Sequence, residues 1–592
     1  MKKKKFMNLC FIVLLSTLLT AGSIPYHAQA KKHPFSYDDY KQVDVGKDGM
    51  VATAHPLASQ IGADVLKKGG NAIDAAVAIQ FALNVTEPMM SGIGGGGFMM
   101  VYDAKTKDTT IIDSRERAPA GAAPDMFLDE NGKAIPFSER VTKGTAVGVP
   151  GTLKGLEKAL DKWGTRSMKQ LITPSIKLAS KGFPIDSVLA DAILDYKDKL
   201  SHTAAKDVFL PDGEPLKEGD TLIQKDLAKT FTAIKYKGTK AFYDGEFSKK
   251  LAETVQEFGG SMTEKDIKNF NVTIDEPIWG NYQGYHIATA PPPSSGGVFL
   301  LQMLNLLDDF KLSQYDIRSW QKYQLLAETM HLAYADRAAF AGDPEFVNVP
   351  LKGLLNPDYI NARRQLIDID KVNKKPKAGD PWAYQEGSAN YKQVKQPTDK
   401  QEGQTTHFTV TDRFGNVVSY TTTIEQLFGS GIMVPGYGVV LNNELTDFDA
   451  VPGGANEVQP NKRPLSSMTP TILFKNNEPV LTVGSPGGAT IISSVLQTIL
   501  NKVEYGMDLK AAVEEPRIYT NSMTSYRYEK GVPEEARTKL NEMGHKFSSS
   551  PVDIGNVQSI LIDRENGTFT GVADSSRNGA AIGVNLKQYK NN

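Results

Sequence analysis

The spacing of apolar side chains along the chain predicts a mixture of buried helices and β-strands. Residues 71–84 are apolar at almost every position, which is typical of a helix that is buried on most of its sides. Helical spacing then dominates from about residue 152 to residue 310. The individual helices expected there and further along the chain cover residues 167–181, 296–309, 320–340 and 490–503.

β-branched runs predict strands around short turns in the second half of the chain. One run begins at Thr405 and another ends at Thr423, and Arg413-Phe414-Gly415 between them predicts a hairpin. Residues 467–474 and 479–483 predict two more strands, and a glycine-rich turn at 484–488 leads into the next helix. With 52 glycines and 32 prolines, a mixed α/β fold with many turns is favoured over a helical bundle.

A polar, lysine-rich segment precedes the hairpin. Residues 370–404 have few periodic apolar positions, so they predict an extended and exposed segment. This segment ends abruptly at Thr405, where the β-branched strand begins. A flexible tract that runs directly into a buried strand is what a proteolytic cleavage site requires.

The N-terminus has the pattern of a secretory signal. Lys2 to Lys5 are followed by an apolar run over residues 9–21 and then by Ala28-Gln29-Ala30, which suits a signal peptidase. The run is shorter than the ~20 residues that span a membrane, so export with maturation after Ala30 is favoured over an anchor. The only cysteine, Cys10, lies inside this segment. The mature chain therefore has no disulfide and no thiol nucleophile.

Composition and motif spacing exclude several classes of function. The formal net charge of −1 gives no basic excess for nucleic-acid binding. The eight histidines show no zinc-binding spacing, and neither a metal nor a cofactor is expected. Gly92 to Gly97 formally match G-x-G-x-x-G, but a helix precedes them and a strand follows, the reverse of a dinucleotide fingerprint. No serine has a convincing nucleophile-elbow context.

Thr405 remains as a candidate nucleophile. A threonine hydroxyl needs an adjacent base, and the α-amino group of the same residue, with a pKa of about 7.7–8.0, is suitable once that residue begins a chain. Such a threonine must first be released from a precursor. A threonine that opens a strand is by itself explained by β propensity, so further motifs must decide.

Motifs in register along nearly the whole mature chain resemble the γ-glutamyltranspeptidase family, and most closely its exported members from Bacillus-like bacteria. Any one of them is weak, but their order and spacing fit throughout. The motifs are Asn71 to Ala76, Gly92 to Gly97, Arg115 with Ala118-Pro119, Pro291 to Gly297, Gln404 to Phe408, Gly415-Asn416, Leu441 to Asn443, Arg463 to Met468 and Gly484 to Gly488.

The resemblance implies an N-terminal-nucleophile hydrolase, a four-layer αββα sandwich built from two autoprocessed subunits. Cleavage between Gln404 and Thr405 would yield a large subunit, residues 31–404, and a small catalytic subunit, residues 405–592. Both would build one domain, although length alone suggests two to four.

The resemblance also implies roles for particular residues. Thr405 would be the nucleophile, Thr423 would orient it, and the N–H groups of Gly487 and Gly488 would bind the oxyanion. The sequence supports this last role independently, because these glycines lie between a strand and the N-terminus of a helix. The carboxylate of a γ-glutamyl donor would be bound by Arg115, Ser466 and Ser467, and its ammonium by Glu425, Glu444 and Asp447.

Two departures from the family pattern concern this donor site. Some members have asparagine and glutamine where this chain has Glu425 and Glu444, so the ammonium pocket is more anionic here. The connection from Phe448 to Lys462 is too short to form the lid that some members carry. An open cleft able to admit poly-γ-glutamate is therefore expected.

The resemblance implies cleavage of glutathione and related γ-glutamyl compounds through a threonyl ester, with transfer to water, amino acids or peptides. The alternatives are a related acylase of the cephalosporin acylase type, an enzyme that processes poly-γ-glutamate, or an uncleaved binding protein for γ-glutamyl peptides. Arg115 together with the three acidic residues favours a glutamyl donor, because an acylase for apolar or dicarboxylic side chains needs no ammonium pocket.

Overall fold

The computed structural model describes residues 35–397 and 403–586. Contacts between Cα atoms divide the chain into Met1–Ser36 and Tyr37–Asn592, and the fold below is that of the second unit. The predicted export signal at residues 1–30 lies outside the described residues. Among the described residues, none of the helices has both the length and the apolar character needed to cross a membrane.

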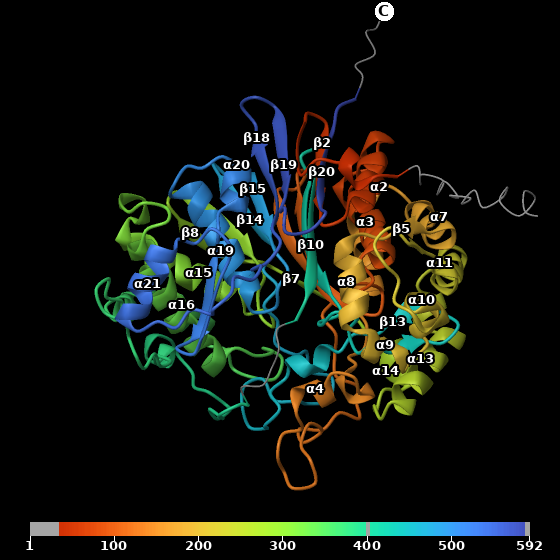
Figure 1. The fold of residues 1–592 in the computed structure, drawn as a ribbon, viewed down its shortest axis with the longest axis horizontal. Helices are drawn as coiled ribbons and strands as arrows, with labels where there is room; N and C mark the ends of the chain where they lie inside the picture. The colour runs from red at the N-terminus through yellow and green to blue at the C-terminus, as the bar shows by residue number, and fades with distance from the viewer. Residues whose placement is uncertain (1–34, 398–402, 587–592) are drawn as a thin grey trace, which may run out of the picture. The chain divides into compact units, whose positions relative to one another are not determined.

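Two seven-stranded antiparallel sheets form the centre of this unit (Figure 1). The first has the order β1 (Val43–Gly46), β19 (Thr568–Ala573), β18 (Gln558–Asp563), β15 (Glu478–Gly484), β14 (Thr471–Lys475), β9 (Tyr285–Thr289) and β8 (Ile278–Tyr282). The second has the order β20 (Ala580–Val584), β2 (Gly49–Thr53), β10 (Thr405–Asp412), β11 (Val417–Thr423), β3 (Gly96–Asp103), β4 (Asp108–Asp113) and β7 (Thr273–Asp275).

The central strands of the second sheet, β2, β10, β11 and β3, are buried on both faces, whereas the edge strand β7 is partly exposed. In β3, Met99 and Val101 pack in the core under one helical layer, whereas Phe98 and Met100 pack in the core that the two sheets share. Because side chains alternate across a strand, this division places the sheet inside the protein with apolar contacts on each side.

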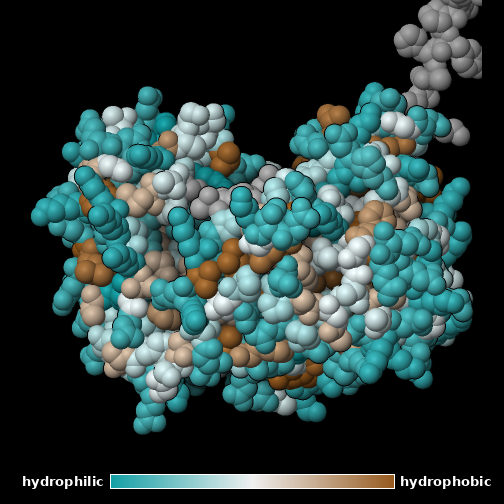
Figure 2. All heavy atoms as spheres, turned by 90° about the horizontal axis from the view of Figure 1, so that it is seen from below, coloured by the Kyte–Doolittle hydropathy of each residue, from teal (hydrophilic) through white to brown (hydrophobic). Residues whose placement is uncertain are grey.

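Helices cover the outer faces of both sheets, as the fold class predicts (Figure 1). Over the second sheet lie α2 (Pro56–Lys67), α3 (Ala72–Thr86), α5 (Thr152–Trp163), α7 (Thr173–Lys181), α8 (Ser187–Asp195), α11 (Lys225–Lys237) and α13 (Glu246–Glu257). Over the first lie α15 (Gly296–Leu307), α16 (Trp320–Phe340), α19 (Thr490–Val503) and α21 (Glu534–Met543). Hydrophilic side chains dominate the face in Figure 2, and hydrophobic groups are scattered there.

Several local predictions are confirmed. Helix α3 has every residue buried and begins with a capping box between Asn71 and Asp74. Helices α16 and α19 have the expected bounds, and β10 and β11 form the expected hairpin. The glycine turn before β3 is a close backbone contact, since a Cβ on Gly95 would overlap the carbonyl group of Thr423.

Other predictions are wrong, for identifiable reasons. Residues 167–181 form two helices, α6 (Met168–Leu171) and α7, because Pro174 has no N–H to continue a helix and fits only its first turn. The helix expected to reach Asp309 ends at Leu307, and the next three residues, Asp308–Phe310, form a 3₁₀ turn. Strand β14 starts later than expected, at Thr471. The region expected to be helical also contains β7, β8 and β9, which lie at or beside sheet edges.

Candidate active site

Thr405 is the first residue of β10, which lies between β2 and β11 in the second sheet. The hairpin register places Thr405 directly opposite Thr423, the last residue of β11. The hydroxyl of Thr405 donates to that of Thr423 across 3.3 Å, and both side chains are buried. The predicted hairpin therefore brings the candidate nucleophile and its partner side by side.

The peptide bond between Gln404 and Thr405 is held by hydrogen bonds on both sides. Thr423 donates its hydroxyl proton to the carbonyl oxygen of Gln404 at 2.8 Å and accepts from the backbone N–H of Glu425 at 2.8 Å. Arg577 donates to the carbonyl oxygen of Thr405 and to the side-chain oxygen of Gln404, each at 3.1 Å. A hydroxyl donor is thus already aligned on the carbonyl that Thr405 would attack.

The glycine-rich turn between β15 and α19 lies beside Thr405. Gly487 and Gly488 have φ values of +123° and +56°, which favour glycine over residues with a Cβ. A Cβ on Gly487 would also overlap the hydroxyl of Thr490, which donates to the Gly487 carbonyl at 2.7 Å. The turn therefore needs glycine, and it presents N–H donors at the start of a helix.

A pocket of about 440 Å³ opens at Thr405. Gly488 lines it, whereas Gly487 and Gln404 lie outside its wall. Every other predicted site residue lines it, together with ten residues that were not predicted. The complete lining is Arg115, Arg337, Pro397, Gly403, Thr405, Thr423, Glu425, Glu444, Asp447, Ser466, Ser467, Met468, Gly488, Ala489, Ile491, Asn521, Ser522, Thr524 and Arg527.

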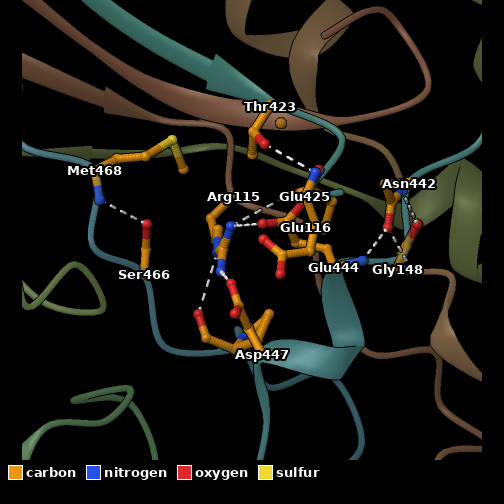
Figure 3. A network of polar contacts seen from close by, with 12 residues as sticks. Arg115, Glu116, Gly148, Thr423, Glu425, Asn442, Glu444, Asp447, Ser466 and Met468 are labelled. Carbon is orange, nitrogen blue, oxygen red and sulfur yellow. Dashed lines mark hydrogen bonds and ion pairs between the residues drawn. The ribbon is translucent and has the colours of Figure 1, made fainter. Parts of the chain in front are cut away.

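Arg115 is paired with two of the predicted ammonium ligands. Its guanidinium forms ion pairs with Glu444 and, at 2.6 Å, with Asp447 (Figure 3). It also donates to the carbonyl oxygens of Pro464 at 3.2 Å and Leu465 at 2.8 Å. The groups expected to bind opposite ends of a glutamyl headgroup therefore pair with one another.

Burial and proximity shift the pKa values of this cluster. Burial raises the pKa of Glu444 well above its usual value, and Arg115 opposes this shift. Burial alone would lower the pKa of Arg115, but Glu444, Asp447 and Glu116 together raise it above its usual value. Burial raises the pKa of Glu116, which lies 3.9 Å from Arg115, to about 8. Arg115 therefore stays positively charged, and the surrounding carboxyl groups of Glu444, Asp447 and Glu116 all interact with this one cation.

The two serines have different surroundings. The Ser466 hydroxyl accepts from the backbone N–H of Met468 at 3.1 Å. The Ser467 hydroxyl accepts from Arg337 at 2.8 Å, and the same guanidinium donates to Ser295 at 2.8 Å. Arg337 thus holds Ser467 at the pocket wall.

Comparison with protein families matches residues 58–584 to γ-glutamyltranspeptidase. The chain belongs to the γ-glutamyltranspeptidase family. It is therefore an enzyme of γ-glutamyl transfer, and the two packed sheets between helical layers are those of an N-terminal-nucleophile hydrolase.

Known members and solved structures are similar over much of this γ-glutamyltranspeptidase. The glutathione hydrolase proenzyme of Bacillus subtilis strain 168 is 84% identical over 585 residues, which is 99% of this chain and 100% of that protein. The crystal structure of a cephalosporin acylase from Bacillus halodurans has a TM-score of 0.81 at 26% identity, covering 94% of this chain and 99% of its own. The Helicobacter pylori γ-glutamyltranspeptidase has a TM-score of 0.54 at 40% identity, covering 56% and 96%.

Sequence reasoning missed several polar residues of this γ-glutamyltranspeptidase. Arg577 donates to the carbonyl of Thr405 and to the side chain of Gln404, Arg337 holds Ser467, and Glu116 adjoins Arg115. Of these three residues, Arg337 alone could have been suspected from the sequence, because it is a cation near the end of a largely buried helix. The hairpin of β16 (Ile518–Ser522) and β17 (Ser525–Tyr528), which supplies one pocket wall, was not predicted.

The three acidic residues are also spaced closely enough to contact one cation. Glu425, Glu444 and Asp447 each offer a carboxylate oxygen within 4.8 Å of the other two. Arg115 already pairs with two of these residues, so the cluster carries a cation of its own. A mixed cluster of this kind suits the paired charges of an amino-acid headgroup.

Proposed function

We propose that this enzyme cleaves itself between Gln404 and Thr405 and then uses Thr405 to cleave the γ-glutamyl bond of glutathione and related compounds. The observation that carries the proposal is the alignment of Thr405, Thr423 and the Gln404 carbonyl group. The glutathione hydrolase proenzymes that resemble this chain support both the processing and the substrate.

Autoprocessing begins with attack of the Thr405 hydroxyl on the carbonyl carbon of Gln404. The developing oxyanion receives the hydrogen bond from Thr423, which lies within the usual 2.7–3.1 Å at 2.8 Å. The C–N bond breaks, the α-amino group of Thr405 takes the proton, and an ester to the threonine oxygen remains. Water then hydrolyses this ester, leaving a carboxylate on Gln404 and a free N-terminal threonine.

The two products, residues 31–404 and 405–592, stay together as one αββα domain. The support is that β10 and β11 of the small subunit lie between β2 and β3 of the large subunit in one sheet. Separating the two subunits would break the backbone hydrogen bonds of β10 with β2 and of β11 with β3. It would also expose the apolar faces of the second sheet to water.

The glutamyl donor binds by exchanging partners within the charged cluster. Its α-carboxylate takes the guanidinium of Arg115 from Glu444 and Asp447, with the hydroxyls of Ser466 and Ser467 as further donors. The released carboxylates, together with Glu425, bind the α-ammonium group. Because the headgroup is a zwitterion, its binding leaves the net charge of the cluster unchanged, and each of its two charged groups gains partners of opposite sign.

Transfer then proceeds through a threonyl ester. The free α-amine of Thr405 accepts the hydroxyl proton as the oxygen attacks the γ-carbonyl. The N–H groups of Gly487 and Gly488 bind the oxyanion, and the leaving amine takes the proton as its bond breaks. Water, an amino acid or a peptide then takes the glutamyl group.

Export and an open cleft complete the proposal. The N-terminal pattern supports secretion. No residue of the connection from 448 to 462, all of which the structure describes, lines the pocket. Its absence from the pocket wall supports access for poly-γ-glutamate.

Denaturing electrophoresis tests the processing. Wild type should separate into two fragments with Thr405 at the new N-terminus, Thr405→Ala should stay whole, and Thr405→Ser should be cut in part. Intact yet active wild-type protein would disprove the mechanism.

A matched substrate pair tests the headgroup. The enzyme should turn over γ-glutamyl-p-nitroanilide far better than glutaryl-p-nitroanilide, which lacks only the α-amino group. Equal kcat/KM for the two anilides would favour an acylase.

A further inference from the structure

The helical layer over the second sheet carries a strongly basic surface. Residues 166–181 and 225–240, which contain α6, α7 and α11, hold nine cationic side chains and one acidic side chain, a net charge of +8. The whole chain has a formal net charge of −1, so positive charge is concentrated in these two segments. We call their outer side the basic face. Its cations are Arg166, Lys169, Lys177, Lys181, Lys225, Lys229, Lys235, Lys237 and Lys240.

The two segments form one surface because α7 and α11 lie side by side and run in opposite directions (Figure 1). The backbone N–H of Gln224, just before α11, donates to the carbonyl oxygen of Ala179, near the end of α7, at 2.8 Å. At the opposite end, the ammonium group of Lys169 lies 5.3 Å from the ring centre of Tyr236 in α11. At 1.5 Å per residue, the 13 residues of α11 extend the basic face over roughly 20 Å.

Packing of the apolar side chains fixes the cations on the outside of the layer. In α11, Leu227, Phe231 and Ile234 are buried in the core, and the lysines occupy the exposed side, as in any amphipathic helix. The single acidic residue of the two segments, Asp226, is paired with Lys229 at 2.8 Å. The basic face therefore presents a row of positive charges to solvent, and such a surface attracts a polyanion.

The residue types of the basic face favour a polymer of carboxylates over a nucleic acid. Eight of the nine cations are lysines, which act as compact point charges, whereas the planar fork of arginine is preferred for phosphate and nucleic-acid recognition. The two segments contain one exposed aromatic residue, Tyr236, which is 68% exposed. A single ring gives no series of platforms on which successive bases could stack.

The basic face is separate from the pocket at Thr405, because none of its nine cations, all of which the structure describes, lines that pocket. The proposed action on poly-γ-glutamate places only the terminal residue in the pocket, so the rest of the polymer remains outside as a chain of free carboxylates.

Building on that proposed function, we propose that the basic face is a second binding surface for poly-γ-glutamate. It holds the interior of the polymer by charge while the terminal residue enters the pocket. Attachment at two places makes binding of the polymer end intramolecular, and this raises the local concentration of that end. Lysine contacts with single carboxylates are individually weak, so the polymer can shift along the face as it is shortened.

Removal of charge from the basic face tests the proposal. The test variant changes four exposed lysines of α7 and α11 to glutamine: K177Q, K181Q, K225Q and K237Q. The matched control removes the same charge from exposed lysines in the layer over the first sheet: K510Q, K530Q, K539Q and K546Q.

At low ionic strength, the KM for glutamate release from long poly-γ-glutamate should rise about tenfold in the test variant, as expected for the loss of four exposed charge contacts. The KM for γ-glutamyl-p-nitroanilide should stay at the wild-type value, because this donor is too small to reach the basic face. The control should match wild type with both donors. High salt should abolish the difference between wild type and the test variant, because exposed charges are then screened.

Fluorescence anisotropy of labelled poly-γ-glutamate, read immediately after mixing on ice, measures binding independently of cleavage. Wild type and the control should bind the polymer about tenfold more tightly than the test variant. Equal polymer KM and affinity in wild type and the test variant, or an equal loss in the control, would overturn the proposal. Tighter binding of wild type to a labelled DNA duplex than to the polymer would assign the face to nucleic acid and also overturn it. Failure of the proposed function is distinct, because wild type would then bind the polymer without releasing glutamate from it.

Discussion

Replacing Thr423 by valine should slow self-cleavage strongly while leaving the fold intact. The substitution keeps the shape of the side chain and removes one hydroxyl. That hydroxyl makes three contacts, with the Gln404 carbonyl at 2.8 Å, the Glu425 N–H at 2.8 Å and the Thr405 hydroxyl at 3.3 Å. The losses of the first two contacts have separate consequences.

The contact with the Gln404 carbonyl decides the rate. Loss of one donor to a developing oxyanion costs about 10²–10³ in rate, or about 2.7–4 kcal/mol. The lost contact with Glu425 leaves a buried N–H without this partner, which lowers stability by about 1–3 kcal/mol. Thr423→Val should therefore fold and persist as a precursor whose half-life is about 100- to 1000-fold longer than that of wild type.

The assay follows the precursor band on denaturing gels after rapid purification, with far-ultraviolet circular dichroism and a melting curve as checks of folding. Thr423→Ser, which keeps the hydroxyl but gains rotamer freedom, is the matched control and should be processed within about tenfold of the wild-type rate. A folded Thr423→Val protein that is cut as fast as wild type would refute the role of this hydrogen bond.

Three further predictions concern the donor site. Arg115→Lys keeps the charge but loses the planar guanidinium group. The KM for a γ-glutamyl anilide should therefore rise about 10- to 100-fold, with a smaller change in kcat. An unchanged KM would show that Arg115 does not bind the donor. Poly-γ-glutamate should release free glutamate early while its mean length falls slowly, because only a terminal residue has the free α-amine; rapid shortening with little glutamate would contradict this. Burial raises the pKa of Glu116 from 4.5 to about 8, so the folded protein binds the Glu116 proton more tightly than the unfolded chain does. The stability that this proton contributes therefore declines as the pH rises from 4.5 to about 8. The Tm of Glu116→Gln should accordingly fall less between pH 5 and 9 than that of wild type, and parallel melting curves would contradict the assignment.

Local sequence determines the elements that carry the nucleophile. The β-branched runs and the turn between them suffice to predict the β10–β11 hairpin, and the hairpin register then places Thr405 opposite Thr423. Helices α3 and α19 are similarly determined by continuous apolar runs with capping or turn residues in front. In these elements the interacting residues are close in sequence, so short-range propensities decide the structure.

The tertiary structure alone decided how the rest of the site is assembled. Arg527 and Arg577 lie on parts of the chain that are distant in sequence from Thr405, and no local pattern separates them from other polar residues. Strands β7 and β9 were missed for the same reason, since β7 pairs with β4 and β9 pairs with β14, both far along the chain. Strand β8 was also missed, although its partner β9 follows it directly in the sequence. The pairing of Arg115 with Glu444 and Asp447 was also not foreseen, although all three residues were predicted at the site. Sequence determined which charges meet there, but only the packing of distant segments made them one another's partners.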